Sequence, residues 1–168
     1  MQTSIMVMDY KDVMKDKAMY AYIFSEGNKH LESLLNFCFN NNIETFACCK
    51  GHIDNKNSFP YVGFAFLDNE KLIYSNLISL LSKSKINDYI RFRLYKYRDK
   101  YRLICDIREK YSKNRFVINK VFKALEDGLS FCLTSFKFDD FYFDIFAFYC
   151  NLFKSKSASI NSFTLDNI

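Results

Sequence analysis

The chain has 168 residues, 49% of them hydrophobic, and a formal net charge of +5 at pH 7. This length supports one domain with a hydrophobic core, and the presence of only four glycines and one proline excludes a low-complexity or loop-rich protein. The sequence begins without the apolar run of a signal peptide, and its longest apolar run, Phe141 to Phe153, is too short to cross a bilayer. We therefore expect a soluble, cytoplasmic protein that contacts no membrane and keeps its six cysteines reduced.

Hydrophobic periodicity predicts helices and strands that are mixed along the chain. Asn28 is placed to cap a helix, a turn at Arg98-Asp99-Lys100 separates two alternating runs, and Gly128 is expected to end the last helix. In chain order, the predicted elements are helices at 11–24 and 30–40, strands at 44–49 and 61–67, a helix from 68, hairpin strands at 86–97 and 101–108, and a helix at 113–126.

This order of elements predicts an α+β fold, a single domain in which helices pack on an antiparallel or mixed sheet. We expect the domain to span residues 1–153, with the aromatic-rich segment after 129 left unassigned. The Ser- and Asn-rich residues 154–168 are predicted to be a disordered tail.

Positive charge is concentrated in the predicted hairpin and the helix after it. Between Arg91 and Lys123 there are twelve Lys or Arg and three acidic residues, a net charge of +9, so the rest of the chain carries −4. Strand alternation sends apolar residues to the core and the arginines to the other face. Arginines with interleaved tyrosines can bind phosphates and bases, although they are also ordinary on the solvated face of an antiparallel sheet. The candidate phosphate-binding residues of the hairpin are Arg91, Arg93, Arg102 and Arg108.

The end of the first predicted strand, Cys48-Cys49-Lys50-Gly51-His52, collects several reactive side chains. Cys49 and His52 could ligate zinc, but zinc needs three or four protein ligands, and no such set can be assembled from the sequence. Cys49 could instead be a nucleophile activated by His52 and Lys50, or one cysteine could pack in the core beside a polar turn. We favour a turn in which Lys50, the Gly51 backbone and His52 hold an anion. Alternation also predicts that Cys48 and Cys49 face opposite sides of the sheet.

The segment from Asp16 to the second predicted strand resembles the tRNA wybutosine-synthesis methyltransferase family over roughly the first 67 residues. That family has a helix ending in Leu-Asn, followed by a strand that runs through Ser-Ser-Cys-Ser-Gly-Arg. Cys49 and Gly51 match its Cys and Gly, whereas Lys50 replaces a serine and His52 replaces the Arg. The resemblance implies an α+β fold, a site at this turn, and methyl transfer from S-adenosylmethionine to a modified guanosine in tRNA. We carry over the fold and the place of the site, and leave the cofactor and the reaction open.

Two kinds of function follow from these features. The first is an RNA- or nucleotide-binding protein, related to a tRNA-modifying methyltransferase, in which the basic hairpin and the residues Cys49, Lys50, Gly51 and His52 contact the ligand. The second is a small non-enzymatic inhibitor of mobile-element or phage type, for example an anti-CRISPR, that blocks the nucleic-acid-binding groove of a protein partner. The sequence leaves the oligomeric state and the presence of any chemistry open.

Overall fold

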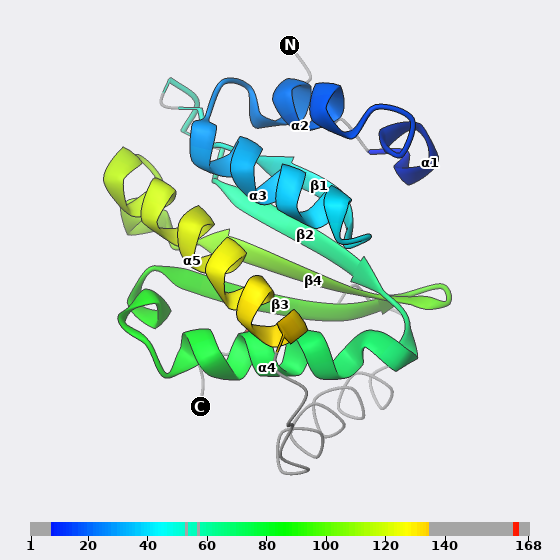
Figure 1. Ribbon diagram of the computed structural model, residues 1–168. Coiled ribbons are helices and arrows are strands. Elements are labelled where there is room, and N and C mark those ends of the chain that lie inside the picture. Colours follow the sequence, from blue (N-terminus) through cyan, green and yellow to red (C-terminus); the bar gives the residue numbers. More distant parts are fainter. Residues whose placement is uncertain (1–7, 53, 57, 135–162, 165–168) are drawn as a thin grey trace.

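The computed structural model describes residues 8–134, apart from 53 and 57, together with 163–164 (Figure 1). Its central feature is an antiparallel sheet in the order β1-β2-β4-β3-β5. The strands are β1 (Glu44–Cys49), β2 (Tyr61–Phe66), β3 (Ile90–Tyr97), β4 (Lys100–Ile107) and β5 (Phe163–Thr164). The predicted α+β class is confirmed, and the choice left open between an antiparallel and a mixed sheet is settled as antiparallel.

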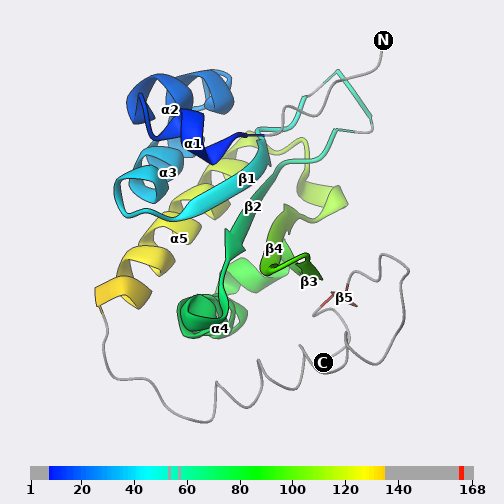
Figure 2. The ribbon, with the colours of Figure 1, turned by 90° about the vertical axis from the view of Figure 1, so that its right-hand side faces the viewer.

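The helices lie on one side of this sheet, as the view in Figure 2 shows. They are α1 (Tyr10–Val13), α2 (Lys17–Ser25), α3 (Lys29–Asn40), α4 (Lys71–Ser82) and α5 (Arg115–Thr134). Three short 3-10 turns connect strands and helices: η1 (Asp68–Glu70), η2 (Lys85–Asp88) and η3 (Glu109–Tyr111).

One hydrophobic core fills the space between the helices and the sheet. Leu34 and Leu35 of α3 and Leu125 of α5 are fully buried against the strands, together with Phe64 of β2 and Leu103 of β4. Burial of each such side chain contributes about 2 kcal/mol to folding. Because the core takes every second residue of β3 and β4, the alternate residues of the hairpin are placed on the face away from the helices.

The prediction of one continuous helix at 11–24 is wrong, because the chain forms two helices, α1 and α2, with a break between them. The side chain of Asp16 accepts a hydrogen bond from the Met19 backbone N–H at 3.0 Å and so starts a new helix. The cap predicted at Asn28 is confirmed: its Oδ1 accepts hydrogen bonds from the N–H groups of His30 and Leu31, both at 3.0 Å.

The end predicted for the last helix at Gly128 is also wrong. Gly128 is buried within α5, and a Cβ atom there would lie 2.7 Å from Leu77 Cδ1 of α4. The glycine is therefore a point of close approach between two helices and not a helix terminator. At the other end, Asn114 accepts a hydrogen bond from the Val117 N–H at 3.2 Å and caps α5.

The predicted hairpin is confirmed with two corrections. Its first strand starts at Ile90, because Ser84 caps the 3-10 turn η2 and takes residues 85–88 out of the sheet. Its turn has two residues, Arg98 and Asp99, so that Tyr97 pairs with Lys100 and Arg91 pairs with Asp106.

The predictions made for the C-terminal part of the chain concern residues that the structure describes only in part. The aromatic-rich segment after 129 begins as the last part of α5, and residues 135–153 lie outside the described residues. The predicted tail at 154–168 also lies outside them, except for Phe163 and Thr164, which pair with Leu94 and Arg93 of β3.

Candidate functional site

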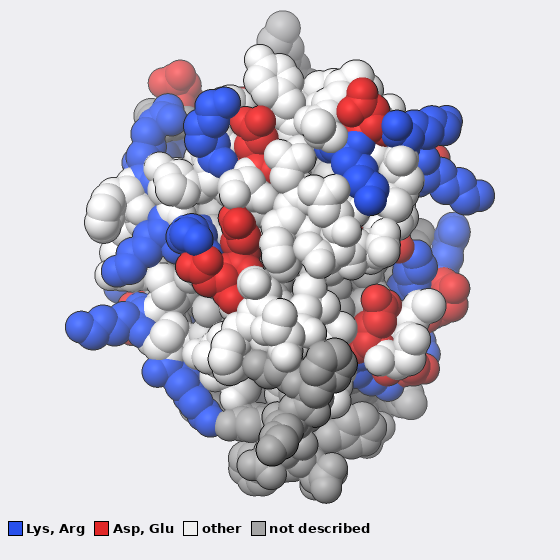
Figure 3. All heavy atoms as spheres, in the orientation of Figure 1, with Lys and Arg blue, Asp and Glu red and all other residues white. Residues whose placement is uncertain are grey.

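The hairpin arginines belong to the sheet face opposite the helices. Arg91 and Arg93 alternate with the buried residues Phe92 and Leu94, and Arg102 follows the same rule on β4. The opposite, helix-covered side of the molecule carries basic and acidic side chains interspersed around a largely uncharged centre (Figure 3). The hairpin is therefore the better place for an anion site.

A buried carboxylate organises the arginines at one end of the hairpin. Asp106 is 5% exposed and accepts two hydrogen bonds from Arg93, from Nε at 2.5 Å and from Nη2 at 2.8 Å. This hydrogen bonding raises the pKa of the Arg93 guanidinium. Arg91 Nη2 lies 3.6 Å from the same carboxylate. Arg93 therefore occupies the geometry of a bidentate pair, and Arg91 has a longer ionic contact.

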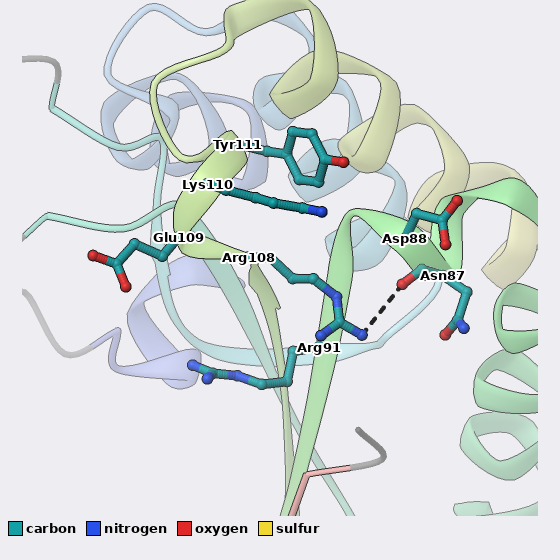
Figure 4. A pocket seen from close by; sticks show the side chains of 7 residues that line it. All are labelled: Asn87, Asp88, Arg91, Arg108, Glu109, Lys110 and Tyr111. Carbon is teal, nitrogen blue, oxygen red and sulfur yellow. Dashed lines mark hydrogen bonds between the residues drawn. The ribbon is translucent and has the colours of Figure 1, made fainter. Parts of the chain in front are cut away.

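A cavity of about 550 Å³ opens where β3 and β4 diverge into η2 and η3. Figure 4 shows the side chains of Lys110 and Arg108 pointing the same way, while the Arg91 side chain below them points to the other side; all three cations line the cavity. The lining residues are Asn87, Asp88, Arg91, Arg108, Glu109, Lys110 and Tyr111. The same lining holds two carboxylates, those of Glu109 and Asp88, so three cations and two acids give it a formal net charge of +1.

The two arginines that line the cavity differ in how their N–H groups are hydrogen-bonded. Arg108 Nη2 donates to the Asn87 carbonyl oxygen at 3.4 Å, which fixes Arg108 across the cavity. The Nε of Arg91 is buried and has no acceptor among the residues that the structure describes. A buried donor without a partner costs about 1 to 3 kcal/mol, whereas the rest of the Arg91 side chain, which is 43% exposed, offers donors that an anion can reach.

Arg102 lies in a different environment, on aromatic rings toward the hairpin turn. Its guanidinium carbon is 4.4 Å from the centre of the Phe46 ring and 4.1 Å from that of Tyr97. The four candidate arginines therefore do not form one uniform surface: Arg91 and Arg108 line the cavity, Arg93 clamps Asp106, and Arg102 contacts rings.

The turn after β1 holds an anion from its own chain. Lys50 Nζ donates to the Glu26 carbonyl oxygen at 2.6 Å and lies 3.8 Å from the Glu26 carboxylate. His52 Nε2 lies 3.3 Å from the same carboxylate. Glu26 reaches them because it ends α2 in the left-handed conformation, with φ 50°. Lys50 and His52 do gather around a carboxylate, as an anion-holding turn requires, and that carboxylate is internal.

Lys113 fixes the loop that follows this turn. Its Nζ donates to the carbonyl oxygens of His52 and Asn55, both at 2.7 Å, and to that of Ser58 at 3.4 Å. Gly51 has φ 79°, and a Cβ there would lie 2.6 Å from the Pro60 ring, so only glycine fits this position without strain. The loop is therefore held at both ends by contacts within the protein.

The adjacent cysteines contact different segments, in agreement with strand alternation. Cys48 Sγ lies 3.6 Å from the Phe24 carbonyl oxygen on the helix side, and burial raises the pKa of its thiol. Cys49 Sγ accepts a hydrogen bond from the Gly51 N–H at 3.3 Å and lies 3.5 Å from Ser58 Oγ.

Pairing across the sheet places Cys49 in a row with Tyr61, Asp106 and Arg91, roughly 14 Å from Arg91 at the usual strand spacing. The turn and the hairpin cavity are thus separate places.

Among the described residues, no group of three or more His, Cys, Asp or Glu side chains is placed to hold a metal ion. The five cysteines in this part of the chain are free thiols. No helix in the described ranges has the length and apolar character needed to span a membrane.

Sequence reasoning missed the residues that complete the cavity. Lys110 and Tyr111 were part of the basic segment but had no assigned role, and Asp106 was not recognised as the partner of Arg93. A signal for Asp106 existed: with a two-residue turn, antiparallel pairing places it opposite Arg91. Lys110 and Tyr111 depend on how the chain turns after β4, for which the sequence offers no comparable rule.

Comparisons of the chain with protein-family models, with curated proteins and with solved structures found no match. The functional proposal is therefore built on the geometry of the site.

Proposed function

We propose that the protein binds a phosphate-bearing ligand, a nucleotide or RNA, in the cavity between η2 and η3. The observation that carries the proposal is the presence of Arg91, Arg108 and Lys110 in the lining of one cavity. Guanidinium groups match the geometry of phosphate oxygens, and a lysine adds a mobile point charge. Together they form a cationic site of the kind that anionic ligands need.

The other walls of the cavity suit the remainder of a nucleotide. A volume of about 550 Å³ is within the range of small-ligand sites. Asn87 and Asp88 supply oxygen acceptors for ribose hydroxyls, and the Tyr111 ring, with Lys110 Nζ 4.7 Å from its centre, supplies an apolar surface.

The proposal concerns binding and includes no reaction. Methyl transfer, which the resemblance implies, stays a prediction. Lys50 and His52, two residues of the segment that carries the resemblance, contact Glu26 in a region separate from the cavity. The inhibitor hypothesis also stays a prediction, because a basic hairpin would serve it equally.

The test is a binding titration of fluorescently labelled RNA and of a labelled nucleotide over a series of salt concentrations. Removing one phosphate-binding cation reduces the slope of log K against log salt by about 0.7 to 0.9. The double variant Arg91→Ala, Arg108→Ala should therefore bind at least about tenfold more weakly, with a slope lower by roughly 1.5.

The matched control is Lys29→Ala, which removes an exposed cation from α3 on the helix side of the sheet. It should leave both affinity and slope near the parent values. Circular dichroism of each variant checks that the fold is intact. If the double variant binds like the parent, the cavity is not the site.

A further inference from the structure

We infer that the ligand of the proposed site is a single-stranded nucleic acid that runs along β3, with a base stacked at the hairpin turn. This inference rests on the proposed function, because it starts from a phosphate in the cavity. It adds a second contact region, the ring-and-guanidinium cluster of Phe46, Arg102, Tyr97 and Arg98 at the opposite end of the hairpin.

The cluster is a continuous run of contacts between aromatic rings and guanidinium groups. Arg102 lies over the rings of Phe46 and Tyr97, at 4.4 and 4.1 Å, and Arg98 lies over the Tyr97 ring at 5.3 Å. Tyr97 is 44% exposed and Arg98, at the turn, is exposed as well. The run therefore ends in flat groups that remain accessible to solvent.

Flat groups of this kind are what unpaired bases stack on. Aromatic rings and guanidinium planes bind the faces of bases without regard to sequence, and the contacts already made within the cluster hold these planes in position before a ligand arrives. In a duplex the base faces are covered by their neighbours, so a stacking surface of this kind distinguishes single strands from double strands.

The two regions are too far apart for one mononucleotide. Arg91, at the cavity, and Tyr97, in the cluster, are both on β3 and project from the same face, with Arg93 and Tyr95 between them. Six residues of strand span about 20 Å. A single strand that keeps the duplex spacing of about 3.4 Å per nucleotide covers this distance in about six nucleotides, and a more extended strand needs fewer. Figure 1 shows the β3–β4 turn projecting at the far end of the hairpin from η2 and η3.

The experiment compares ligand lengths and substitutes the stacking residues. Affinity of the purified full chain is measured for uridine monophosphate, for oligouridylate of about eight nucleotides, and for an RNA duplex of the same length. The variants are Arg98→Lys, which keeps the charge but loses the guanidinium plane, and Tyr97→Ala, which removes the ring. Lys29→Ala again serves as the control for charge.

The parent protein should bind the oligonucleotide at least about tenfold more tightly than the mononucleotide and than the duplex. Arg98→Lys and Tyr97→Ala should each remove several-fold of the oligonucleotide affinity and leave mononucleotide binding unchanged. Equal affinity for the three ligands, or an unchanged oligonucleotide affinity in both variants, overturns the inference while leaving the cavity in place. If substitution of Arg91 and Arg108 weakens the binding of neither ligand, the cavity itself is overturned, and the inference with it.

Discussion

Two of the cationic regions in the described part of the chain, the turn after β1 and the cavity at the end of the hairpin, differ in what supplies their anion. At the turn, Lys50 and His52 both contact the Glu26 carboxylate, which lies on the neighbouring helix terminus. At the cavity, the carboxylate next to Arg91 is that of Asp106, and its bidentate geometry is already taken by Arg93. Arg91 keeps a 3.6 Å contact and a buried Nε without an acceptor among the described residues.

This difference shows why cations that look equivalent in a sequence need not be equivalent in a site. A cation whose charge is matched inside the protein must give up that partner before it binds a ligand, and the energy of the broken ion pair lowers the affinity. A cation left with a poor internal partner has no such cost. The hairpin cavity is therefore the better candidate for an external anion, although the turn has the denser group of reactive residues.

The largest effect that this comparison predicts comes from removing Asp106. Asp106→Ala leaves Arg93, whose side chain is 31% exposed, without its bidentate partner and close to Arg91 with no negative charge between them. Breaking such a pair from one side should lower the free energy of unfolding by about 3 kcal/mol. Urea denaturation measures this change.

The control for Asp106 is Asp12→Ala, which breaks the exposed pair with Lys15. That substitution should cost well under about 1 kcal/mol, because exposed pairs contribute little to stability. Similar losses for the two variants would mean that Asp106 does not organise the arginines.

The second prediction sets the two regions against each other in ligand binding. Arg91→Ala should weaken the binding of a phosphate-bearing ligand by about tenfold, the effect of losing one charge-assisted hydrogen bond. Lys50→Ala and His52→Gln should change it by less than about twofold, because both residues are engaged with Glu26. Isothermal titration of the three variants measures the effect. If Lys50→Ala and His52→Gln weakened binding more than Arg91→Ala, the site would lie at the turn, as the sequence-based interpretation of Lys50, Gly51 and His52 predicts.

Much of the fold could be predicted because its signals are local. The Asn28 cap depends on one side chain and the next three residues, and the alternation of β3 and β4 is visible in the sequence. The break before α2 and the start of β3 follow from local caps at Asp16 and Ser84, whereas the end of the last helix was wrong because a tertiary contact decides it. Gly128 continues a helix because α4 packs closely against it, and local propensity cannot show that contact.

The candidate site was less predictable because it depends on partners that are distant in sequence. Strand alternation placed Arg91 and Arg93 correctly on the face away from the helices, but their different roles follow from Asp106 on another strand. The identity of the anion at the turn depends on Glu26, which reaches it only because α2 ends beside β1. The periodicity of a sequence predicts the face on which a side chain lies, but it does not predict which side chains from other elements contact it.

The third prediction concerns the loop between β1 and β2. Lys113→Ala removes donors to the carbonyl oxygens of His52, Asn55 and Ser58. The loop should then open more often, so limited proteolysis within it should be faster, while global stability falls by only about 1 kcal/mol. Lys113→Arg, which retains donors, should be intermediate. Because the loop lies apart from the cavity lining, ligand affinity should stay at the parent value; a weaker affinity would mean that the two regions are coupled.

The smallest effect, and the sharpest test of the comparison, comes from Glu26→Gln. The glutamine keeps the shape of the side chain but removes the charge that matches Lys50 and His52, in a group that is 42% exposed. Stability should fall by only about 0.5 kcal/mol, as expected for an exposed ion pair. The turn, now without its internal negative charge, should then accept an external anion: phosphate should raise the melting temperature of the variant more than that of the parent, with chloride at the same ionic strength as the reference. Thermal denaturation in the two buffers provides the measurement. Equal responses of parent and variant would show that Lys50 and His52 do not act as an anion site even when the charge of residue 26 is removed.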